Sequence, residues 1–464
     1  MDTALDNALL ARCAQKYGTP LYVYDFHSIT TQFQAFKDAF KARKSLICYA
    51  LKANPNLSII SHLAELGSGA DCVSIGEVRR ALLAGIPKYK IIYSGVGKRD
   101  DEIREALRSD ILFLNVESRA ELERIESIAK ELGLVARISV RVNPNIDAKT
   151  HPYISTGLHE NKFGVDIQSA KQMYIYAKNS PHIKPIGIHF HIGSQLTDLE
   201  PIKQGAQKIA ELTHSLLALK IEIRFFDVGG GVGIRYTDER EISLYDYAQA
   251  ILAALRGLDV SIICEPGRYI VGKSGVLLSK VLYEKHNGHK RFVIVDAAMN
   301  DLMRPALYNA VHTMRVVQRD NALESNTESS APHTQGAPRT ESSAPNTPNT
   351  PNTQATQDTP NPQTSKADVV GAICESSDFL AKDIALPTLT HSDIVAFENV
   401  GAYGYSMAHT YNTRPRAAEV GVQDGEDFLI KPAETFESLV ASELETLRQR
   451  RAGLDSKGGQ CKRA

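Results

Sequence analysis

The chain has 464 residues, of which 43% are hydrophobic and 23% are charged, an ordinary composition for a globular protein long enough for two domains. Its formal net charge of −1 excludes a general electrostatic attraction to nucleic acid or to an anionic membrane surface. The sequence shows no apolar run of the roughly 18 residues that a membrane helix needs, no basic signal-peptide region and no C-x-x-C pair. We therefore expect a cytoplasmic protein without a disulfide framework or a metal site.

A short β-rich run near the N-terminus, "PLYVYD" at 20–25, precedes a long region of alternating strand and helix patterns. Within 119–132, leucine and isoleucine recur at helical spacing while Glu and Lys fill the other face. Several strand candidates are almost continuously apolar, which is typical of parallel strands covered on both faces. The eight candidates lie at 45–50, 70–74, 90–94, 111–116, 137–142, 186–192, 224–229 and 261–266. This α/β pattern predicts a (β/α)8 TIM-type barrel over 27–267, with a doubly wound sheet as the alternative.

After the barrel, the pattern changes to β-rich segments without regular helices. We expect 268–320 and 367–447 to form a second, mainly β domain, which residues 1–26 join through their strand. Residues 321–366 contain one large aliphatic residue and the repeat "PNTPNTPNT", so they cannot bury enough apolar surface to offset the entropy of ordering. We expect them to be a disordered, low-complexity insert, and the basic residues 448–464 to be a solvated tail.

Polar and glycine residues collect where the predicted strands end, which in a (β/α)8 barrel is the rim that carries function. Lys52 follows the first strand and His191 ends the sixth, while "GGGVG" at 229–233 and "EPGR" at 265–268 follow the seventh and eighth. Barrels often bind phosphate with the loops after strands seven and eight, because glycine lets backbone amides approach an anion closely. The alternative is that these glycines only make tight turns.

A lysine beside a phosphate-binding loop indicates pyridoxal 5'-phosphate (PLP). Lys52 would bind the aldehyde of the cofactor as a Schiff base, a role that lysine alone fills among side chains. His191 would stack on the pyridine ring, and Glu265 would pair with the ring nitrogen and keep it protonated, which favours carbanion chemistry. Each residue also has a structural alternative: a surface lysine, a satisfied polar residue of the rim and an ordinary salt bridge.

Several segments carry a resemblance to a known family: "YALKANPN" (49–56), "HFHIGSQ" (189–195), "DVGGGVG" (227–233), "EPGR" (265–268), "DAAMNDLMRPALY" (296–308), "CESSDFLAKD" (374–383) and "ENVGAYGYSM" (398–407). In these segments the sequence resembles the diaminopimelate decarboxylases, fold-type III PLP enzymes related to ornithine decarboxylase and alanine racemase. The resemblance starts at "YGTPLYVYD" (17–25) and covers nearly the whole chain, apart from the expected insert and tail.

The resemblance implies roles for individual residues. Lys52, which carries PLP, and Cys374, the proton donor, would be the catalytic residues. The cofactor-binding residues would be Lys52, His191, Ser194, Gly229, Gly230, Gly231, Glu265, Pro266, Gly267, Arg268 and Tyr403. The substrate-binding residues would be Arg268, Arg304, Tyr308, Glu375 and Tyr403. The chain would form a homodimer with shared active sites, in which Cys374 and Glu375 come from the partner chain.

The implied substrate is meso-2,6-diaminopimelate, which would be converted into L-lysine and CO₂ in the last step of lysine biosynthesis. Its far end carries a carboxylate, which arginine can grip in bidentate fashion, and an ammonium, which glutamate can accept. Ornithine-type enzymes usually place aspartate after the equivalent cysteine, whereas Glu375 follows it here, accompanied by Arg268 and Arg304.

Other functions remain as alternatives. The chain could be a PLP-dependent decarboxylase of ornithine, arginine or carboxynorspermidine, or a catalytically inactive homologue that regulates a decarboxylase. An inactive homologue would have lost the lysine or the phosphate motifs, and both are intact. Alanine racemase shares the barrel and the lysine but would need a different residue at Glu265.

Overall fold

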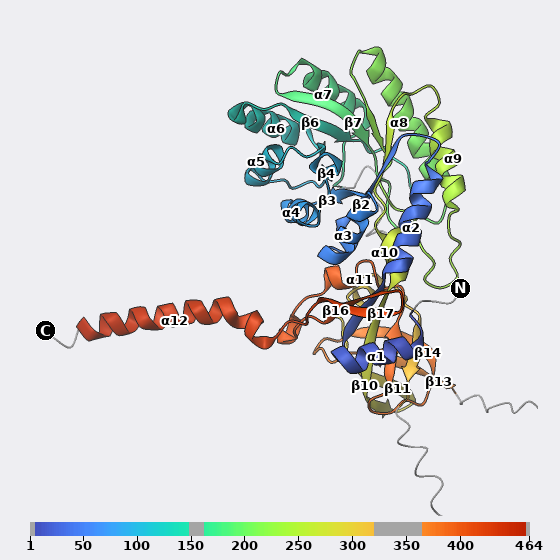
Figure 1. Cartoon of the computed structure of the whole chain (residues 1–464), viewed down its shortest axis with the longest axis vertical. Helices are drawn as coiled ribbons and strands as arrows, with labels where there is room; N and C mark the ends of the chain where they lie inside the picture. Colours follow the sequence, from blue (N-terminus) through green and yellow to red (C-terminus); the bar gives the residue numbers. More distant parts are fainter. Residues whose placement is uncertain (1–4, 148–161, 320–363, 461–464) are drawn as a thin grey trace, which may run out of the picture.

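The computed structural model describes residues 5–147, 162–319 and 364–460. Figure 1 shows a barrel of strands surrounded by helices, a smaller β-rich body beside it, and one long helix that extends away from both. None of the helices in these three ranges is both long and apolar enough to cross a membrane.

Eight parallel strands form a closed ring in chain order, and the ring closes because β2 pairs with β9. The strands are β2 (Ser45–Ala50), β3 (Gly69–Cys72), β4 (Ile91–Tyr93), β5 (Phe113–Val116), β6 (Ala136–Arg141), β7 (Ile183–His189), β8 (Phe225–Asp227) and β9 (Ser261–Cys264). This closure confirms the predicted barrel and excludes a doubly wound sheet, which would have two open edges. The strand ends differ from the predicted ones by at most three residues, because hydrogen bonds to neighbouring strands define them.

Helices cover the outside of the barrel (Figure 1). They are α2 (Phe26–Ala39), α3 (Leu57–Glu65), α4 (Ile75–Leu83), α5 (Asp100–Arg108), α6 (Arg119–Leu132), α7 (Ile167–Asn179), α8 (Glu200–Ala218), α9 (Leu244–Ala254) and α10 (Arg268–Val271). Helix α6 matches the predicted helix, and its ends follow from local chemistry. The side chain of Ser118 accepts a hydrogen bond from the backbone N–H of Glu121, and Gly133 ends the helix with a φ of 65°.

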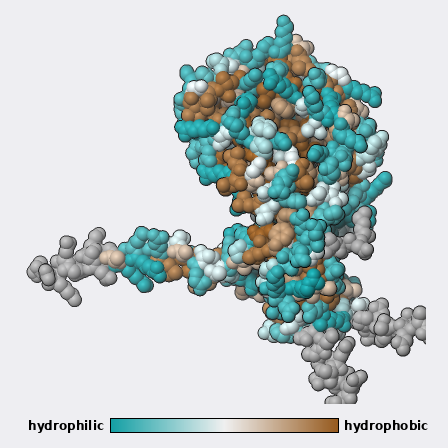
Figure 2. All heavy atoms as spheres, viewed as in Figure 1, coloured by the Kyte–Doolittle hydropathy of each residue, from teal (hydrophilic) through white to brown (hydrophobic). Residues whose placement is uncertain are grey.

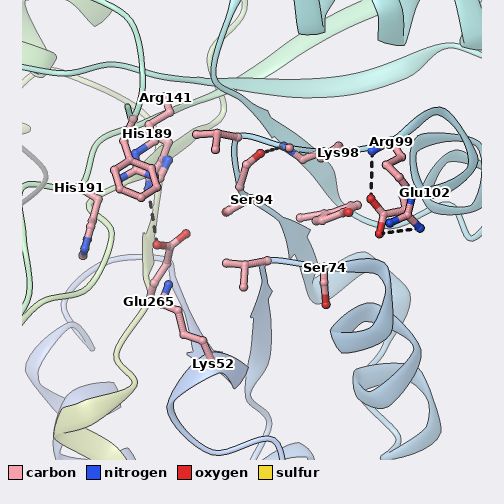
Figure 3. A pocket seen from close by; sticks show the side chains of 16 residues that line it. Lys52, Ser74, Ser94, Lys98, Arg99, Glu102, Arg141, His189, His191 and Glu265 are labelled. Atoms are coloured by element: carbon pink, nitrogen blue, oxygen red, sulfur yellow. Dashed lines mark hydrogen bonds and ion pairs between the residues drawn. The ribbon is translucent and has the colours of Figure 1, made fainter. Parts of the chain in front are cut away.

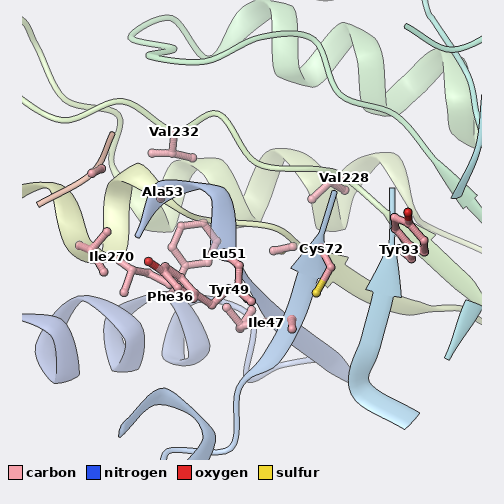
Figure 4. Close-up of a cluster of buried hydrophobic side chains, with 14 of the residues drawn as sticks. Phe36, Ile47, Tyr49, Leu51, Ala53, Cys72, Tyr93, Val228, Val232 and Ile270 are labelled. Carbon is pink, nitrogen blue, oxygen red and sulfur yellow. The ribbon is translucent and has the colours of Figure 1, made fainter. Parts of the chain in front are cut away.

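Two apolar layers support the rim of the barrel. Outside the ring, Phe36 of α2, Tyr49 and Ile47 of β2, and Ile270 of α10 belong to one buried cluster (Figure 4). Inside the ring, a separate cluster fills the space between the strands and consists of Cys48, Ile92, Phe113, Ile186 and Ile263. Each large aliphatic or aromatic side chain buried in this way contributes roughly 1.5–3 kcal/mol. The barrel interior is therefore a packed core, and a site can form only at its rim.

The second body is a nine-stranded sheet, which confirms the predicted mainly β domain. In this sheet β1 (Leu21–Asp25) lies between β10 (Gly275–Asn287), to which it is antiparallel, and β16 (Ala418–Gln423), to which it is parallel. The other strands are β11 (Lys290–Val295), β12 (Met314–Gln318), β13 (Thr364–Val370), β14 (Phe379–Pro387), β15 (Ile394–Phe397) and β17 (Glu426–Lys431). Three further helices belong to this part of the chain: α1 (Asn7–Tyr17), α11 (Arg304–Tyr308) and α12 (Phe436–Gln460).

Two expected segment boundaries change in the structure. Residues 364–366, predicted as the end of the insert, begin β13 and pair through their backbone with β14. Their side chains are exposed, so composition could not separate them from the preceding residues. Residues 448–460, predicted as a solvated tail, are the end of α12, and residues 448–452 are exposed. The rest of the expected insert and tail, 320–363 and 461–464, lies outside the described residues.

Helix α12 extends away from the β domain (Figure 1). Figure 2 shows hydrophobic residues among the hydrophilic ones along it, and Phe436, Leu444 and Leu447 are all exposed.

Candidate active site

A pocket of about 520 Å³ opens at the rim where the barrel strands end. Figure 3 shows that Lys52, His191 and Glu265 line this pocket together with side chains of the neighbouring loops. The three residues follow β2, β7 and β9, which are far apart in the sequence. The structure thus brings together the residues on which the prediction of a PLP site depends.

Lys52 lies on a short 3-10 turn, η1 (Leu51–Ala53), directly after β2. Its Nζ donates a hydrogen bond to Oδ2 of Asp71 at 2.9 Å, and the Asp71 side chain is fully buried. Burial opposes the charge on Lys52, but Asp71, Tyr403 and Glu265 outweigh it and raise the pKa of the lysine above its ordinary value. Lys52 is therefore a paired cation inside the pocket and not a lysine of the outer surface.

Asp71 is a site residue that the sequence analysis missed. Its Oδ1 accepts a hydrogen bond from Ser94 Oγ at 3.1 Å, and Ser94 Oγ accepts one from Asn115 Nδ2 at 3.0 Å. These polar side chains come from β3, the end of β4 and β5, so adjacent strands fix the carboxylate that holds Lys52. An aspartate in a predicted buried strand is unusual, and this feature of the sequence could have indicated Asp71 as a site residue.

Glu265, which follows β9, is buried with two other polar residues, His189 and Asp227. Its Oε2 is 3.5 Å from His189 Nε2, whereas its Oε1 has no hydrogen-bond partner among the described residues. Burial would raise the pKa of Glu265, but His189 and Lys52 outweigh burial and hold it below its ordinary value. Burial and the charge of Glu265 raise the pKa of Asp227 well above its ordinary value. Within this pair, the structure therefore favours the negative charge on Glu265 over that on Asp227.

His191, at the end of the turn after β7, carries no charge. Its Nδ1 accepts a hydrogen bond from the backbone N–H of Gly230 at 3.2 Å, so the ring proton lies on Nε2. Burial, together with the cations Arg141 and Lys52, lowers its pKa well below the ordinary value. A neutral imidazole suits contact with the face of an aromatic ring better than contact with an anion.

Glycines allow the loops after β7, β8 and β9 to lie against one another. Gly229 has a φ of 66°, and a Cβ there would come within 2.7 Å of the carbonyl oxygen of Phe190. A Cβ on Gly230 would overlap the carbonyl of Glu265. In the loop after β9, a Cβ on Gly267 would lie 3.0 Å from Cβ of Ala53, the residue next to Lys52. These glycines therefore permit close backbone approach between loops, in addition to any role in tight turns.

A second pocket, of about 450 Å³, adjoins the first, because His191 lines both. It contains Arg268, Arg304, Tyr308, Tyr403 and Ser194. Arg268 donates hydrogen bonds to the hydroxyl of Tyr236 at 2.6 Å and to Ser194 Oγ at 3.1 Å.

Both arginines of the second pocket are buried cations, and the described residues provide no counter-ion for them. Among the described residues, neither Arg268 nor Arg304 forms an ion pair with a carboxylate. Burial and repulsion by Arg268 lower the pKa of Arg304, although Tyr236 opposes this. Two uncompensated guanidinium groups are unfavourable unless an anion joins them. The pocket is therefore suited to anionic groups of a ligand.

Tyr403 connects the β domain to the turn of Lys52. Its backbone N–H donates to the carbonyl oxygen of Ala53 at 2.8 Å, and its φ of 59° is in the left-handed region. The guanidinium of Arg268 lies 4.9 Å from the centroid of its ring. A bulky residue in this conformation is uncommon and often marks a functional site.

These features fit PLP. The ring nitrogen of the cofactor would supply the donor that Glu265 Oε1 lacks, and its phosphate would supply an anion beside Arg268, whose Nε also has no partner among the described residues. The amine that the aldehyde needs, Nζ of Lys52, is in the same pocket.

Comparisons with known proteins identify the family. The family model described as the pyridoxal-dependent decarboxylase, pyridoxal binding domain, matches residues 26–272. A diaminopimelate decarboxylase of Helicobacter pylori is 54% identical over 433 residues, which cover 93% of this chain and 97% of that protein. One from Pseudomonas aeruginosa is 44% identical and covers 94% of this chain and 96% of that protein. The chain belongs to the diaminopimelate decarboxylase family.

A solved structure agrees with this assignment. A crystal structure of diaminopimelate decarboxylase from Helicobacter pylori complexed with L-lysine has a TM-score of 0.83 at 53% identity, covering 94% of this chain and 100% of that one. A lysine/ornithine decarboxylase from Vibrio vulnificus, at 20% identity and a TM-score of 0.72, shares the fold. As a diaminopimelate decarboxylase, the chain uses PLP to convert meso-2,6-diaminopimelate into L-lysine and CO₂. This confirms the predicted activity and cofactor.

Two predicted site residues of this diaminopimelate decarboxylase line neither pocket. Cys374 and Glu375 are exposed on the loop between β13 and β14. The backbone N–H of Cys374 donates to Oδ1 of Asn412 at 2.9 Å, which fixes the loop rather than the thiol. Neither residue lines the pocket of Lys52 or that of Arg304. A single chain therefore does not bring them to the site.

Proposed function

We propose that Lys52 binds PLP covalently and that Glu265 pairs with the ring nitrogen of the cofactor. The observation that supports this most is the state of Glu265, a buried and charged carboxylate near Lys52 with one oxygen unpaired among the described residues. A charged carboxylate there keeps the ring nitrogen protonated. When bound, PLP supplies the electron sink that stabilises the negative charge left on carbon as CO₂ leaves.

Other residues of the rim hold and orient the cofactor in this proposal. His191 covers one face of the ring without adding a charge. Ser194, Tyr403 and Arg268 bind the phosphate together with the backbone of two loops, Gly229–Gly231 and Pro266–Gly267. The hydrogen bond from Arg268 to Ser194 supports this group, because it places a cation beside the glycine loop. Lys52 would hold the cofactor through its amine until the substrate binds.

The far end of the substrate binds in the second pocket in this proposal. Arg304 and Arg268 face the far carboxylate, and Tyr308 and Tyr403 line the space between the two ends. Within the described ranges, neither guanidinium forms an ion pair with a carboxylate, including Glu239 of the same pocket, which supports this assignment. A bidentate arginine contact would also select against substrates without a second carboxylate.

The active enzyme is proposed to be a homodimer of the cytoplasm. In it, the partner chain supplies Cys374 as proton donor and Glu375 as acceptor for the far ammonium. The exposure of both residues and their absence from the linings of both pockets of their own chain support this arrangement. A twofold interface would place each loop at the other subunit's site.

Replacing Arg304 with alanine is expected to lower kcat/KM for meso-diaminopimelate by about one to two decades. Glu375→Ala should have an effect of the same size, because each residue forms a charge-assisted contact worth roughly 1.5–3 kcal/mol. Both variants should keep the visible absorbance of bound PLP. Arg224→Ala, which removes an exposed arginine paired with Glu222, is the control and should behave like the parent. Parental kinetics in both test variants would show that the far-end assignment is wrong.

The residues between β12 and β13 offer a separate test. These strands are not neighbours, since β12 pairs with β15 whereas β13 pairs with β11 and β14, so a hairpin turn cannot join them. We expect a Gly/Ser linker of about twelve residues in place of 320–363 to preserve the decarboxylation rate. It should also stabilise the protein by about 1 kcal/mol, because the cost of loop closure grows with the logarithm of length.

Thermal unfolding and steady-state kinetics of the shortened protein check this expectation. A shortened protein that folds and binds PLP, but decarboxylates at least tenfold more slowly (about 1.4 kcal/mol), would show that the removed residues take part in catalysis.

A further inference from the structure

His312 is a buried histidine that the resemblance did not assign to the site. It lies between α11 and β12 and is 3% exposed. Its Nδ1 is 2.8 Å from the backbone carbonyl oxygen of Glu398, and its Nε2 is 2.9 Å from Nη1 of Arg304. Both nitrogens of the ring are therefore engaged, one with an acceptor and one with a donor.

These two contacts fix the tautomer of His312. A carbonyl oxygen can only accept, so Nδ1 carries the proton and donates it to Glu398. A guanidinium can only donate, so Nε2 must offer its lone pair to Arg304. Burial and the charge of Arg304 lower the pKa of His312 to about 3, in agreement with a neutral ring.

Tyr236 holds the same guanidinium from another side. The centroid of its ring is 4.7 Å from the guanidinium carbon of Arg304, and its ring meets that of His312 edge to face at 5.4 Å. Tyr236 also accepts the hydrogen bond from Arg268 described above. The ring therefore lies between two cations that would otherwise repel each other.

We infer that His312 is a positioning residue that sets the orientation of Arg304 and so determines recognition of the far carboxylate of the substrate. This inference depends on the proposed role of Arg304. A neutral acceptor is the appropriate partner, because it holds one N–H of the guanidinium and leaves the positive charge for the substrate. An aspartate or glutamate in the same place would neutralise Arg304 and compete with the ligand.

The product offers a way to measure this recognition without turnover. Decarboxylation removes the carboxylate at one end of diaminopimelate, so L-lysine keeps the carboxylate of the other end. Cadaverine has the same carbon chain and both amines but no carboxylate. The ratio of the affinities of the PLP-loaded protein for L-lysine and for cadaverine therefore reports on the contact with Arg304.

Two substitutions separate positioning from packing. His312→Gln retains an acceptor near the place of Nε2, whereas His312→Asn retains only the donor toward Glu398. We expect His312→Asn to weaken L-lysine binding about tenfold and to leave cadaverine binding within about twofold, as measured by calorimetry. His312→Gln should recover most of the L-lysine affinity. In an Arg304→Ala background, His312→Asn should have no further effect on the ratio.

The outcomes of the experiment distinguish a positioning role of His312 from a packing role. Equal losses of L-lysine and cadaverine affinity in His312→Asn, or the same loss in the Arg304→Ala background, would overturn the inference and leave His312 with a packing role. Failure of His312→Gln to bind L-lysine better than His312→Asn would also overturn it. If Arg304→Ala itself leaves the ratio unchanged, the proposed function of Arg304 fails, and the role of His312 fails with it.

Discussion

Lys52→Ala is expected to abolish decarboxylation of meso-2,6-diaminopimelate and the visible absorbance that PLP acquires when it is bound covalently. The turn after β2 places this amine at the pocket, where Asp71 holds it and Glu265 lies close by. Among the described residues, no other lysine lining that pocket is free to replace it, because Lys98 is buried in a salt bridge with Glu121. Nothing in the variant would then form the covalent bond with the cofactor.

Absorbance spectra after addition of PLP, and CO₂ release from the substrate, measure both effects. Lys88→Ala is the matched control, since Lys88 forms an exposed pair with Asp110 outside the pocket. A Lys52→Ala protein with parental absorbance and activity would show that another residue binds the cofactor.

Cys374→Ala is expected to lower kcat by about two to four decades with a smaller change in KM, as loss of a positioned proton donor does. The position of Cys374 in the structure allows a second test with this variant. Because Cys374 is exposed and lines neither pocket of its own chain, the proposed donor has to reach the site of a second chain. Activity should therefore be recoverable by mixing two inactive variants.

Mixing Cys374→Ala with Lys52→Ala provides that test. Random exchange in equal amounts makes half of the dimers mixed, and each mixed dimer has one intact site, so about a quarter of parental activity should return. Differently tagged chains that purify together would demonstrate exchange. If exchange occurs and no activity returns, the active sites are not shared.

The barrel could be predicted because its signal is local. Each strand from β2 to β9 is a short apolar run, and the sequence places these runs between helical patterns. The end of β7 was less predictable, since "HFHI" continues the apolar pattern although the strand ends at His189. There the chain leaves the ring and forms the turn that carries His191, and only the neighbouring strands determine that point.

The polar residues inside the rim could not be predicted in the same way. Asp71, Ser94 and Asp227 each look like an isolated polar residue in an apolar strand. Their partners are set by which strands become neighbours, and the pairing of β8 with β9 brings Asp227 and Glu265 together. The contact between His312 and Arg304 likewise depends on how α11 packs and not on sequence spacing.

The start of β13 was hidden for a different reason. The backbone of Thr364–Lys366 forms its hydrogen bonds with β14 while the side chains remain exposed, so composition resembles that of the preceding residues. The roles of Cys374 and Glu375 stay predictions, because they concern a second copy of the chain.

The activity of this chain is the PLP-dependent decarboxylation of meso-2,6-diaminopimelate. The most direct test measures CO₂ release and L-lysine formation from meso-2,6-diaminopimelate, beside CO₂ release from ornithine and arginine, by the PLP-loaded protein. We expect L-lysine as the product and a kcat/KM at least about 100-fold higher than for ornithine or arginine, since neither has a far carboxylate for Arg304. Faster CO₂ release from ornithine or arginine, with no L-lysine formed from meso-2,6-diaminopimelate, would contradict it.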